Sequence, residues 1–323
     1  MSVIPGARRG FLILAAPIVA VAVGVGCAQL PVIAANGLLH PARRHVRQPP
    51  PDGCDDINFA GAGVVLRGWR CLASGDARAT VIFLHGVADN RAGVRGVYRR
   101  FTSKGFNVIA YDSRAHGESD GDTCTYGYFE KDDLRRVIDV VQPSPVVLIG
   151  SSLGAAVALQ EAADDARVAA IVAAEVFSDL RTIATERAPF VLSSKTIRKA
   201  FAVAEQAGRF EIDRVSPVDA AAKIRVPVLL IHGERDTDTP PDHSRRVYAA
   251  LAGPKRLLLV PGAGHNQSLS QGAVWDEIDQ WVSDTVSDLV SDTVSESVSD
   301  TLIGSVRRAG RTGTAATGGC SAR

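Results

Sequence analysis

The sequence lacks a charge imbalance, and it lacks the cysteine spacing of a zinc site. Its 323 residues carry 36 Lys and Arg against 35 Asp and Glu, which gives a formal net charge of +1. Because no strong overall field results, the composition does not indicate nucleic acid as a partner. No Cys-x-x-Cys pair is present and no histidine stands near a cysteine at ligand spacing, so we expect no metal. The cysteines are Cys27, Cys54, Cys71, Cys124 and Cys320.

The N-terminal residues combine two arginines with an uncharged apolar run. Arg8 and Arg9 precede the run from Phe11 to Gly26, a pattern typical of an export signal or an uncleaved membrane anchor. We therefore expect residues 1–35 to lie outside the fold, and the folded domain to be membrane-anchored or exported and extracytoplasmic. Two alternatives stay open for Cys27, which is either a lipidated first residue or a small residue in a membrane helix.

Residues 36–53 are basic and rich in proline, which is typical of an extended linker. Their arginines compete with those before the apolar run under the positive-inside bias, so the membrane orientation stays open. The folded domain is expected to begin near Cys54, with a β-hairpin that ends at Cys71. These two cysteines lie at the open ends of the hairpin, and in an exported domain we hypothesise a disulfide between them.

Between residues 79 and 283, continuous apolar runs alternate with helical patterns. The runs lack the period-2 alternation of a half-exposed strand, so each predicts a strand buried on both faces of a parallel sheet. They cover residues 79–84, 107–111, 146–149, 168–174, 226–231 and 256–260. The alternation implies right-handed crossovers and a doubly wound sheet. Residues 176–225 break this rhythm and predict a small helical cap, whose apolar residues line a pocket or pack against the main domain.

One strand pattern leads into Gly150-Ser151-Ser152-Leu153-Gly154 and then into an Ala-rich helical pattern. A Gly-x-Ser-x-Gly turn between strand and helix is a nucleophile elbow, in which the residues two before and two after the serine must be small. Gly150 and Gly154 meet this need around Ser152, so Ser152 rather than Ser151 is the candidate nucleophile. The Gly-x-Ser-x-Gly pattern also arises by chance, so a catalytic role for Ser152 depends on finding a base and an acid elsewhere in the chain.

The backbone N–H groups of Val87 and Leu153 are the candidate oxyanion hole. Leu153 opens the helix after the serine, where free N–H groups and the positive end of the helix dipole point at the nucleophile. Val87 follows a buried strand and a glycine, Gly86, which lets the backbone turn across the top of the sheet. Both donors would then converge beside Ser152.

Two later loops supply an acid and a base. Asp236 and His265 each follow a predicted strand, so both emerge at the same edge of the sheet as Ser152. A serine hydroxyl needs a base to take its proton, and the acid fixes the tautomer of that base. The sequence thus predicts a triad in the order Ser, Asp, His. Asp238 and Glu175 are rival acids, and we rank Asp236 ahead of both.

Three further histidines are not expected to take part in the chemistry. His85 is interpreted as a structural residue that supports the loop before Val87. His243 is expected on the surface of a helix over residues 242–252. His116 lies in a polar loop and has no partner that the sequence identifies.

The domain is expected to end with a helix over residues 273–282. Beyond it the motif Val-Ser-Asp-Thr recurs, with a four-residue period that drifts by about 40° per repeat around a helix. The repeat either extends the last helix or forms a marginal or disordered extension. Because Ser, Asp, Thr and Val are mediocre helix formers, we favour the second alternative and predict a low-complexity disordered tail over residues 284–323.

Five motifs together resemble the α/β-hydrolase superfamily, over about residues 54–283. They are His85-Gly86, residues 111–119, residues 150–154, residues 232–236 and Gly264-His265. The chain is similar to small-capped bacterial serine hydrolases of the serine aminopeptidase-like group. Ala115 departs from the glycine that is usual in the family's loop, but it touches no candidate catalytic residue. The resemblance implies an α/β-hydrolase fold, with a mostly parallel, doubly wound, eight-stranded sheet, an N-terminal hairpin and a small helical cap.

The resemblance also implies a serine hydrolase that uses Ser152, Asp236 and His265, an acyl-enzyme intermediate and no cofactor. The leading interpretation is a carboxylesterase whose small-molecule substrate carries a small or medium acyl group. A thioesterase similar to depalmitoylases, or a serine peptidase, is the alternative enzyme. A catalytically silent binding module is the alternative from another class, and the presence of all three triad residues argues against it.

Overall fold

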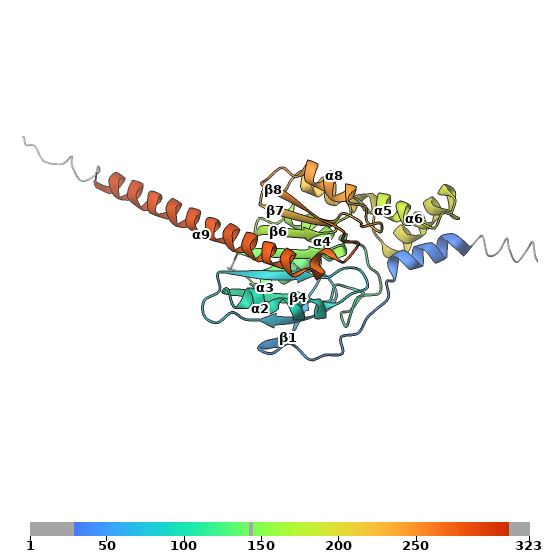
Figure 1. Cartoon of the computed structure of the whole chain (residues 1–323), viewed down its shortest axis with the longest axis horizontal. Coiled ribbons are helices and arrows are strands. Elements are labelled where there is room, and N and C mark those ends of the chain that lie inside the picture. The colour runs from blue at the N-terminus through green and yellow to red at the C-terminus, as the bar shows by residue number, and fades with distance from the viewer. Residues whose placement is uncertain (1–28, 142–144, 310–323) are drawn as a thin grey trace, which may run out of the picture.

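The computed structural model describes residues 29–141 and 145–309 of the chain. An eight-stranded sheet lies at the centre, helices cover both of its faces, and a long C-terminal helix extends away from the domain (Figure 1). The run from Phe11 to Gly26, with its predicted signal or anchor, lies outside the described residues, as do Cys27 and Cys320. Within the described ranges, no helix is both long enough and apolar enough to cross a membrane.

The sheet combines an antiparallel N-terminal hairpin with a parallel body. Its spatial order is β1-β2-β4-β3-β5-β6-β7-β8. β1 pairs antiparallel with β2 and β2 with β4, and the neighbours from β4 to β8 are parallel. The strands are β1 (Cys54–Ala60), β2 (Val65–Cys71), β3 (Ala79–Leu84), β4 (Phe106–Tyr111), β5 (Val146–Ser151), β6 (Val168–Ala174), β7 (Val228–Gly233) and β8 (Lys255–Val260). The predicted mostly parallel, eight-stranded sheet with an N-terminal hairpin is therefore confirmed.

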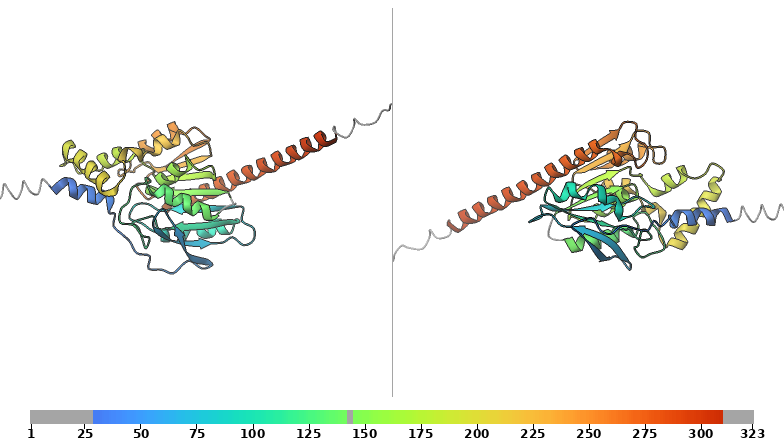
Figure 2. Two further views of the ribbon diagram at one scale, coloured as in Figure 1. Left: turned by 180° about the vertical axis from the view of Figure 1, so that it is seen from behind. Right: turned by 60° about the horizontal axis from the view of Figure 1, so that its bottom comes forward.

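Each face of the sheet has its own apolar cluster. Figure 2 shows the helices that cover the sheet from two further directions. The central strands are buried on both faces because they are continuous runs of Val, Leu, Ile and Ala. One cluster includes side chains of α3 (Glu130–Val141), α4 (Leu153–Ala162), α7 (Pro217–Ala221) and α8 (Asp242–Ala250). The other includes side chains of η1 (Arg91–Gly96), α2 (Tyr98–Thr102) and α9 (Gly272–Ala309).

The stretch predicted as a cap, residues 176–225, forms short helices and no strand. They are α5 (Leu180–Glu186), α6 (Ser194–Gly208), η2 (Ile212–Arg214) and α7. Asp179 caps α5 by accepting a hydrogen bond from the N–H of Thr182 at 2.8 Å. Ala200, Phe201 and Ala204 are buried along one face of α6, and Phe201 and Ala204 belong to the main apolar cluster. The cap is thus anchored by apolar contacts and still presents side chains toward the site.

Residues 29–39 form a helix, here called the N-terminal helix, where the sequence predicted the end of a signal segment and the start of a linker. Ala35 and Leu39, four residues apart, are buried in the main core. The basic stretch that follows is also attached, because the Arg43 guanidinium donates to the carbonyl of Ser119 at 2.8 Å. The sequence predicted that the folded part begins near Cys54, but in the structure residues before Cys54 already pack on the domain. Composition identified a polar stretch, but it did not identify the carbonyl groups to which that stretch donates hydrogen bonds.

The last helix is longer than predicted, because α9 runs from Gly272 to Ala309. Val274, Ile278, Val282 and Val286 recur at four-residue spacing and are buried in the second apolar cluster. The first repeats of the low-complexity segment thus continue a stripe that already packs on the sheet. This tertiary contact offsets the weak helix propensity of Ser, Asp, Thr and Val. The predicted disordered tail from residue 284 is helical as far as residue 309.

The hairpin register places Cys54 opposite Cys71. The two residues form a disulfide, as hypothesised from their positions at the open ends of the hairpin. Cys124 is buried and free. The disulfide joins β1, one of the two edge strands of the sheet, to its neighbour β2.

Candidate active site

Ser152 occupies a strained turn between β5 and α4. Its φ and ψ of 49° and −108° lie outside the allowed regions for a residue with a side chain. The turn is held by close packing: a Cβ on Gly154 would lie 2.1 Å from the carbonyl oxygen of Leu84, and one on Gly150 would lie 2.4 Å from the carbonyl carbon of Gly154. Glycine is therefore required at both positions, as the sequence predicted, while Ser151 remains part of β5.

Asp236 and His265 meet at the carboxyl edge of the sheet. Asp236 follows β7 and His265 follows β8, and the Nδ1 atom of His265 lies 2.7 Å from Oδ2 of Asp236. The other carboxylate oxygen of Asp236 accepts the N–H groups of Thr239 at 2.8 Å and Asp238 at 3.0 Å. The structure thus brings the predicted acid and the predicted base into direct contact.

Hydrogen bonds keep the buried Asp236 carboxylate ionised. Burial by itself raises the pKa of Asp236, but the hydrogen bonds from His232, His265 and the N–H of Thr239 outweigh it and hold that pKa well below its usual range. Because an ionised carboxylate has no proton to donate, Nδ1 of His265 carries the hydrogen in their contact. Nε2 of a neutral His265 is then free to accept a proton.

The two rival acids have other partners. Asp238 is exposed, and its contact with Asp236 is made by its backbone N–H. Glu175 is fully buried, and it accepts the N–H of Asn266 at 2.6 Å and the hydroxyl of Ser268 at 2.7 Å. Glu175 therefore fixes the loop that contains His265 instead of contacting the imidazole. Sequence reasoning noticed Glu175 at the end of its strand but did not identify this positioning role.

The loop after β3 lies directly against the serine. A Cβ on Gly86 would be 3.8 Å from the Cβ of Ser152, which places the next residue, Val87, beside the turn. Within the described residues, the N–H groups of Val87 and Leu153 donate no backbone hydrogen bond to another group. Two unused donors next to a candidate nucleophile match the arrangement of an oxyanion hole.

His85 holds this loop in place, in line with the structural role expected for it. Its Nε2 accepts the N–H of Ser113 at 2.9 Å, so its Nδ1 carries the hydrogen and donates to the carbonyl of Gly86 at 2.7 Å. Burial lowers the pKa of His85, which keeps the ring neutral and this pair of hydrogen bonds intact.

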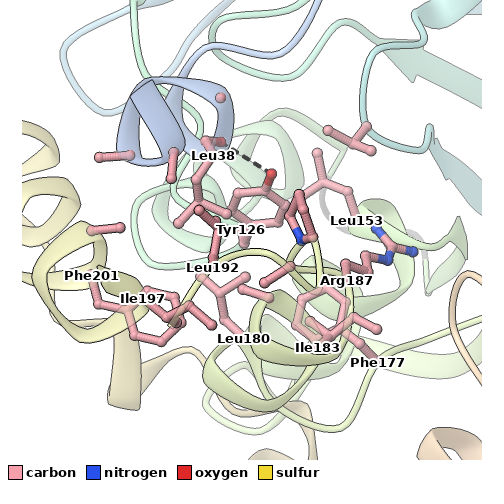
Figure 3. Close-up of a pocket in the computed structure, with 18 of the residues that line it drawn as sticks. Leu38, Tyr126, Leu153, Phe177, Leu180, Ile183, Arg187, Leu192, Ile197 and Phe201 are labelled. Atoms are coloured by element: carbon pink, nitrogen blue, oxygen red, sulfur yellow. Dashed lines mark hydrogen bonds between the residues drawn. The ribbon is translucent and has the colours of Figure 1, made fainter. Parts of the chain in front are cut away.

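Two cavities meet at Ser152. The first has a volume of about 280 Å³ and a mostly apolar lining (Figure 3). The second, of about 630 Å³, is polar, and its lining includes His265, Asn266, Thr237 and Asp238. Val87, Ser152 and Arg187 line both cavities. The first cavity is lined by Ala34, Ala35, Gly37, Leu38, Val87, Tyr126, Ser152, Leu153, Phe177, Leu180, Ile183, Ala184, Arg187, Ala188, Pro189, Leu192, Ile197, Ala200 and Phe201.

Arg187 joins the cap to the loop of the acid, and sequence reasoning missed it. Its Nε donates to the carbonyl of Asp238 at 2.8 Å, and its Nη2 donates to the hydroxyl of Thr239 at 2.6 Å. Thr239 in turn donates its N–H to Asp236. One arginine among several in the cap carries no sequence signal that would have singled it out.

The expectation that His243 is a surface residue is wrong. His243 is fully buried under the cap, where its Nδ1 accepts the N–H of Ser178 at 3.0 Å and its Nε2 donates to the carboxylate of Glu186 at 2.8 Å. The helical pattern of α8 identified the helix, but the cap that covers this position comes from a distant part of the chain.

Within residues 29–141 and 145–309, no group of three or more His, Cys, Asp or Glu side chains is arranged to hold a metal ion.

The chain is similar to known proteins both in sequence and in structure. Residues 81–277 match the model of the Alpha/beta hydrolase family. The uncharacterized protein YfhR of Escherichia coli K12 is 30% identical over 254 residues, which cover 75% of this chain and 83% of YfhR. The uncharacterized protein YqkD of Bacillus subtilis is 30% identical over 219 residues, covering 65% and 72%. The esterase Pf2001 of Pyrococcus furiosus has a similar structure, with a TM-score of 0.61, 24% identity, and coverage of 77% and 98%.

His116 generates a testable prediction about acid stability. The ring is buried, its Nδ1 contacts the carbonyl of Arg114 at 2.8 Å, and burial together with the neighbouring His85 lowers its pKa to about 4. Because the folded-state pKa lies below the unfolded value of about 6.5, the unfolded chain binds the proton preferentially as the pH falls from about 6.5 to 4. We expect this residue to cost about 2 kcal/mol of unfolding free energy between pH 7 and pH 4.5.

The measurement is urea unfolding of the wild type and of His116→Gln at both pH values. The variant should lose less stability on acidification than the wild type does. His45→Gln, which removes an exposed histidine, is the control and should behave like the wild type. An identical loss in the wild type and His116→Gln would contradict the assignment.

Proposed function

We propose that this chain, which belongs to the alpha/beta hydrolase family, is a serine hydrolase that cleaves a carboxylic ester or a related acyl bond. The proposal rests on one observation above all: His265, held by the ionised Asp236, lines the same cavity as the strained Ser152. The proposed catalytic residues are Ser152, His265 and Asp236, and the proposed oxyanion donors are the N–H groups of Val87 and Leu153.

The proposed reaction has two halves. Nε2 of His265 takes the proton of the Ser152 hydroxyl while Oγ attacks the carbonyl carbon, and the developing oxyanion accepts hydrogen bonds from Val87 and Leu153. The tetrahedral intermediate then breaks the bond to the leaving group, which receives the proton from His265. Water repeats the same steps on the acyl-enzyme and releases the acid. Asp236 stabilises the imidazolium that forms twice in each cycle.

The two cavities favour an acyl ester as the substrate. The apolar cavity accommodates an uncharged acyl group, and the polar cavity, which Ser152 also lines, accommodates the leaving group and water. A volume of about 280 Å³ lies just below the ~300–1,000 Å³ typical of ligand pockets, which favours a small or medium acyl group. A thioester or a peptide could use the same nucleophile, but an apolar acyl side favours the ester over the peptide.

One prediction of the proposed function concerns the nucleophile. Ser152→Ala should abolish labelling by a fluorophosphonate probe and lower kcat for p-nitrophenyl acetate by at least ~10³-fold, because the covalent step loses its oxygen. Ser151→Ala is the matched control, since it removes the same hydroxyl from the adjacent residue of β5 and should keep labelling. Failure of the folded wild type to label or to hydrolyse any ester from acetate to dodecanoate would favour the binding-module alternative.

Another prediction separates Asp236 from the rival acid Asp238. Asp236→Asn should lower kcat by roughly 10⁴-fold, because an amide can no longer hold the imidazole in the required tautomer. Asp238→Asn should cause a far smaller loss, under about tenfold, since its carboxylate does not contact His265. Circular dichroism verifies that both variants are folded. A larger loss in Asp238→Asn than in Asp236→Asn is the result that would reassign the acid.

The location of the domain is a further part of the proposal: we expect it outside the cytoplasm. The arginines and apolar run at the N-terminus support export or anchoring, and the Cys54–Cys71 disulfide is of a kind that persists in oxidising compartments. The test quenches cells with an acid and an alkylating mass tag, then counts the tagged thiols. Cys54 and Cys71 should escape tagging unless a reductant is added first; two free thiols in protein from its native compartment would refute the location.

A further inference from the structure

The N-terminal helix is fixed to the main domain by its C-terminal end. The hydroxyl of Tyr126 donates to the carbonyl of Leu38 at 3.1 Å, and the N–H of Cys124 donates to the carbonyl of Leu39 at 2.8 Å. The side chains of Ala35 and Leu39 are buried in the core. Because both backbone and side chains are engaged, the helix holds a defined position on the domain.

One face of this helix closes the apolar cavity beside Ser152. Ala34, Ala35, Gly37 and Leu38 all line it. Figure 3 shows Leu38 on one side of the cavity and Ile197 and Phe201 of the cap on another. The opposite face of the helix is turned to solvent, where Ile33 is 63% exposed. One face of the helix therefore borders the cavity, and the other face is exposed to solvent.

The cavity is kept open by small residues of this helix. Ala34, Ala35 and Gly37 occupy positions where a longer side chain would reach into the space that they now border. The guanidinium of Arg187, the one charged group in the lining, is already bonded to Asp238 and Thr239 at the junction with the polar cavity. The remaining space suits an uncharged hydrocarbon chain.

The wall comes from a segment that precedes the part of the chain matched by the family model, residues 81–277. The serine, the acid and the base all lie inside the matched part. The reacting groups and this wall of the apolar cavity therefore come from different segments of the chain. Selectivity for the acyl group can then be altered at the N-terminal helix without altering the reacting groups.

We infer that the N-terminal helix is a specificity element, and that its side chains at positions 34 and 38 set the length of acyl chain that this enzyme accepts. The inference rests on the proposed function, and it assigns an unbranched, medium-length acyl chain to the space between this helix and α6. Each methylene that enters the cavity raises kcat/KM by about fourfold, until the chain meets the wall.

The experiment measures kcat/KM of the full chain on p-nitrophenyl acetate, octanoate and dodecanoate. Ala34→Phe fills the cavity from the helix side and should lower the octanoate-to-acetate ratio of kcat/KM at least tenfold. Leu38→Ala enlarges the cavity and should raise the dodecanoate-to-octanoate ratio at least threefold. Ile33→Phe is the matched control, because it places the same bulky side chain on the exposed face and should leave both ratios unchanged.

The outcomes are distinct. Opposite shifts in Ala34→Phe and Leu38→Ala, with none in Ile33→Phe, support the inference. The same chain-length profile in Ala34→Phe and Ile33→Phe overturns it, and so does an equal loss on all three esters in a variant that unfolds at the wild-type temperature. If Ala34→Phe does not fold, the profile of Leu38→Ala decides. Failure of the proposed function is recognised separately, because the wild type would then hydrolyse none of the esters.

Discussion

The close approach of α4 to β3 is the constraint on which the site depends. The backbone of Gly154 lies so near the carbonyl of Leu84 that no side chain fits between them, and this contact forces Ser152 into its strained conformation. The same contact brings the start of α4 close to the end of β3, so that Leu153 and Val87 both lie beside Ser152. The strain is sustained because the two buried strands and α4 belong to one continuous core, which leaves the turn no room to relax.

Buried carboxylates fix the loops around that turn. Asp236 accepts two backbone N–H groups of its own loop and contacts His265, while Glu175 accepts N–H groups from the loop of His265. Asp112 does the same on the other side, where it accepts the N–H groups of Arg91 at 2.7 Å and Glu118 at 2.9 Å. A carboxylate can accept several hydrogen bonds at once, so each one orders a loop that has no regular structure.

The apolar cavity proposed for the acyl group is held together by other interactions than the reacting groups are. Its walls are apolar side chains of the cap and of the N-terminal helix, elements held by core contacts and a few hydrogen bonds to carbonyl groups. Such contacts tolerate substitution better than a network of buried charges does, because no unpaired polar group is left behind. The arrangement lets the cavity change shape while the serine, histidine and aspartate keep their geometry.

The sequence by itself determined the sheet, the turn at Ser152 and the loops that bear Asp236 and His265, because apolar runs, glycine spacing and strand order are local signals. It did not determine that His243 lies under the cap, that Glu175 serves the loop of His265, or that residues 29–39 border the acyl cavity. It also favoured disorder where α9 continues past residue 284. Each of these depends on contacts between segments far apart in the chain, and burial and hydrogen-bond partners at such distances are decided only when the segments pack together.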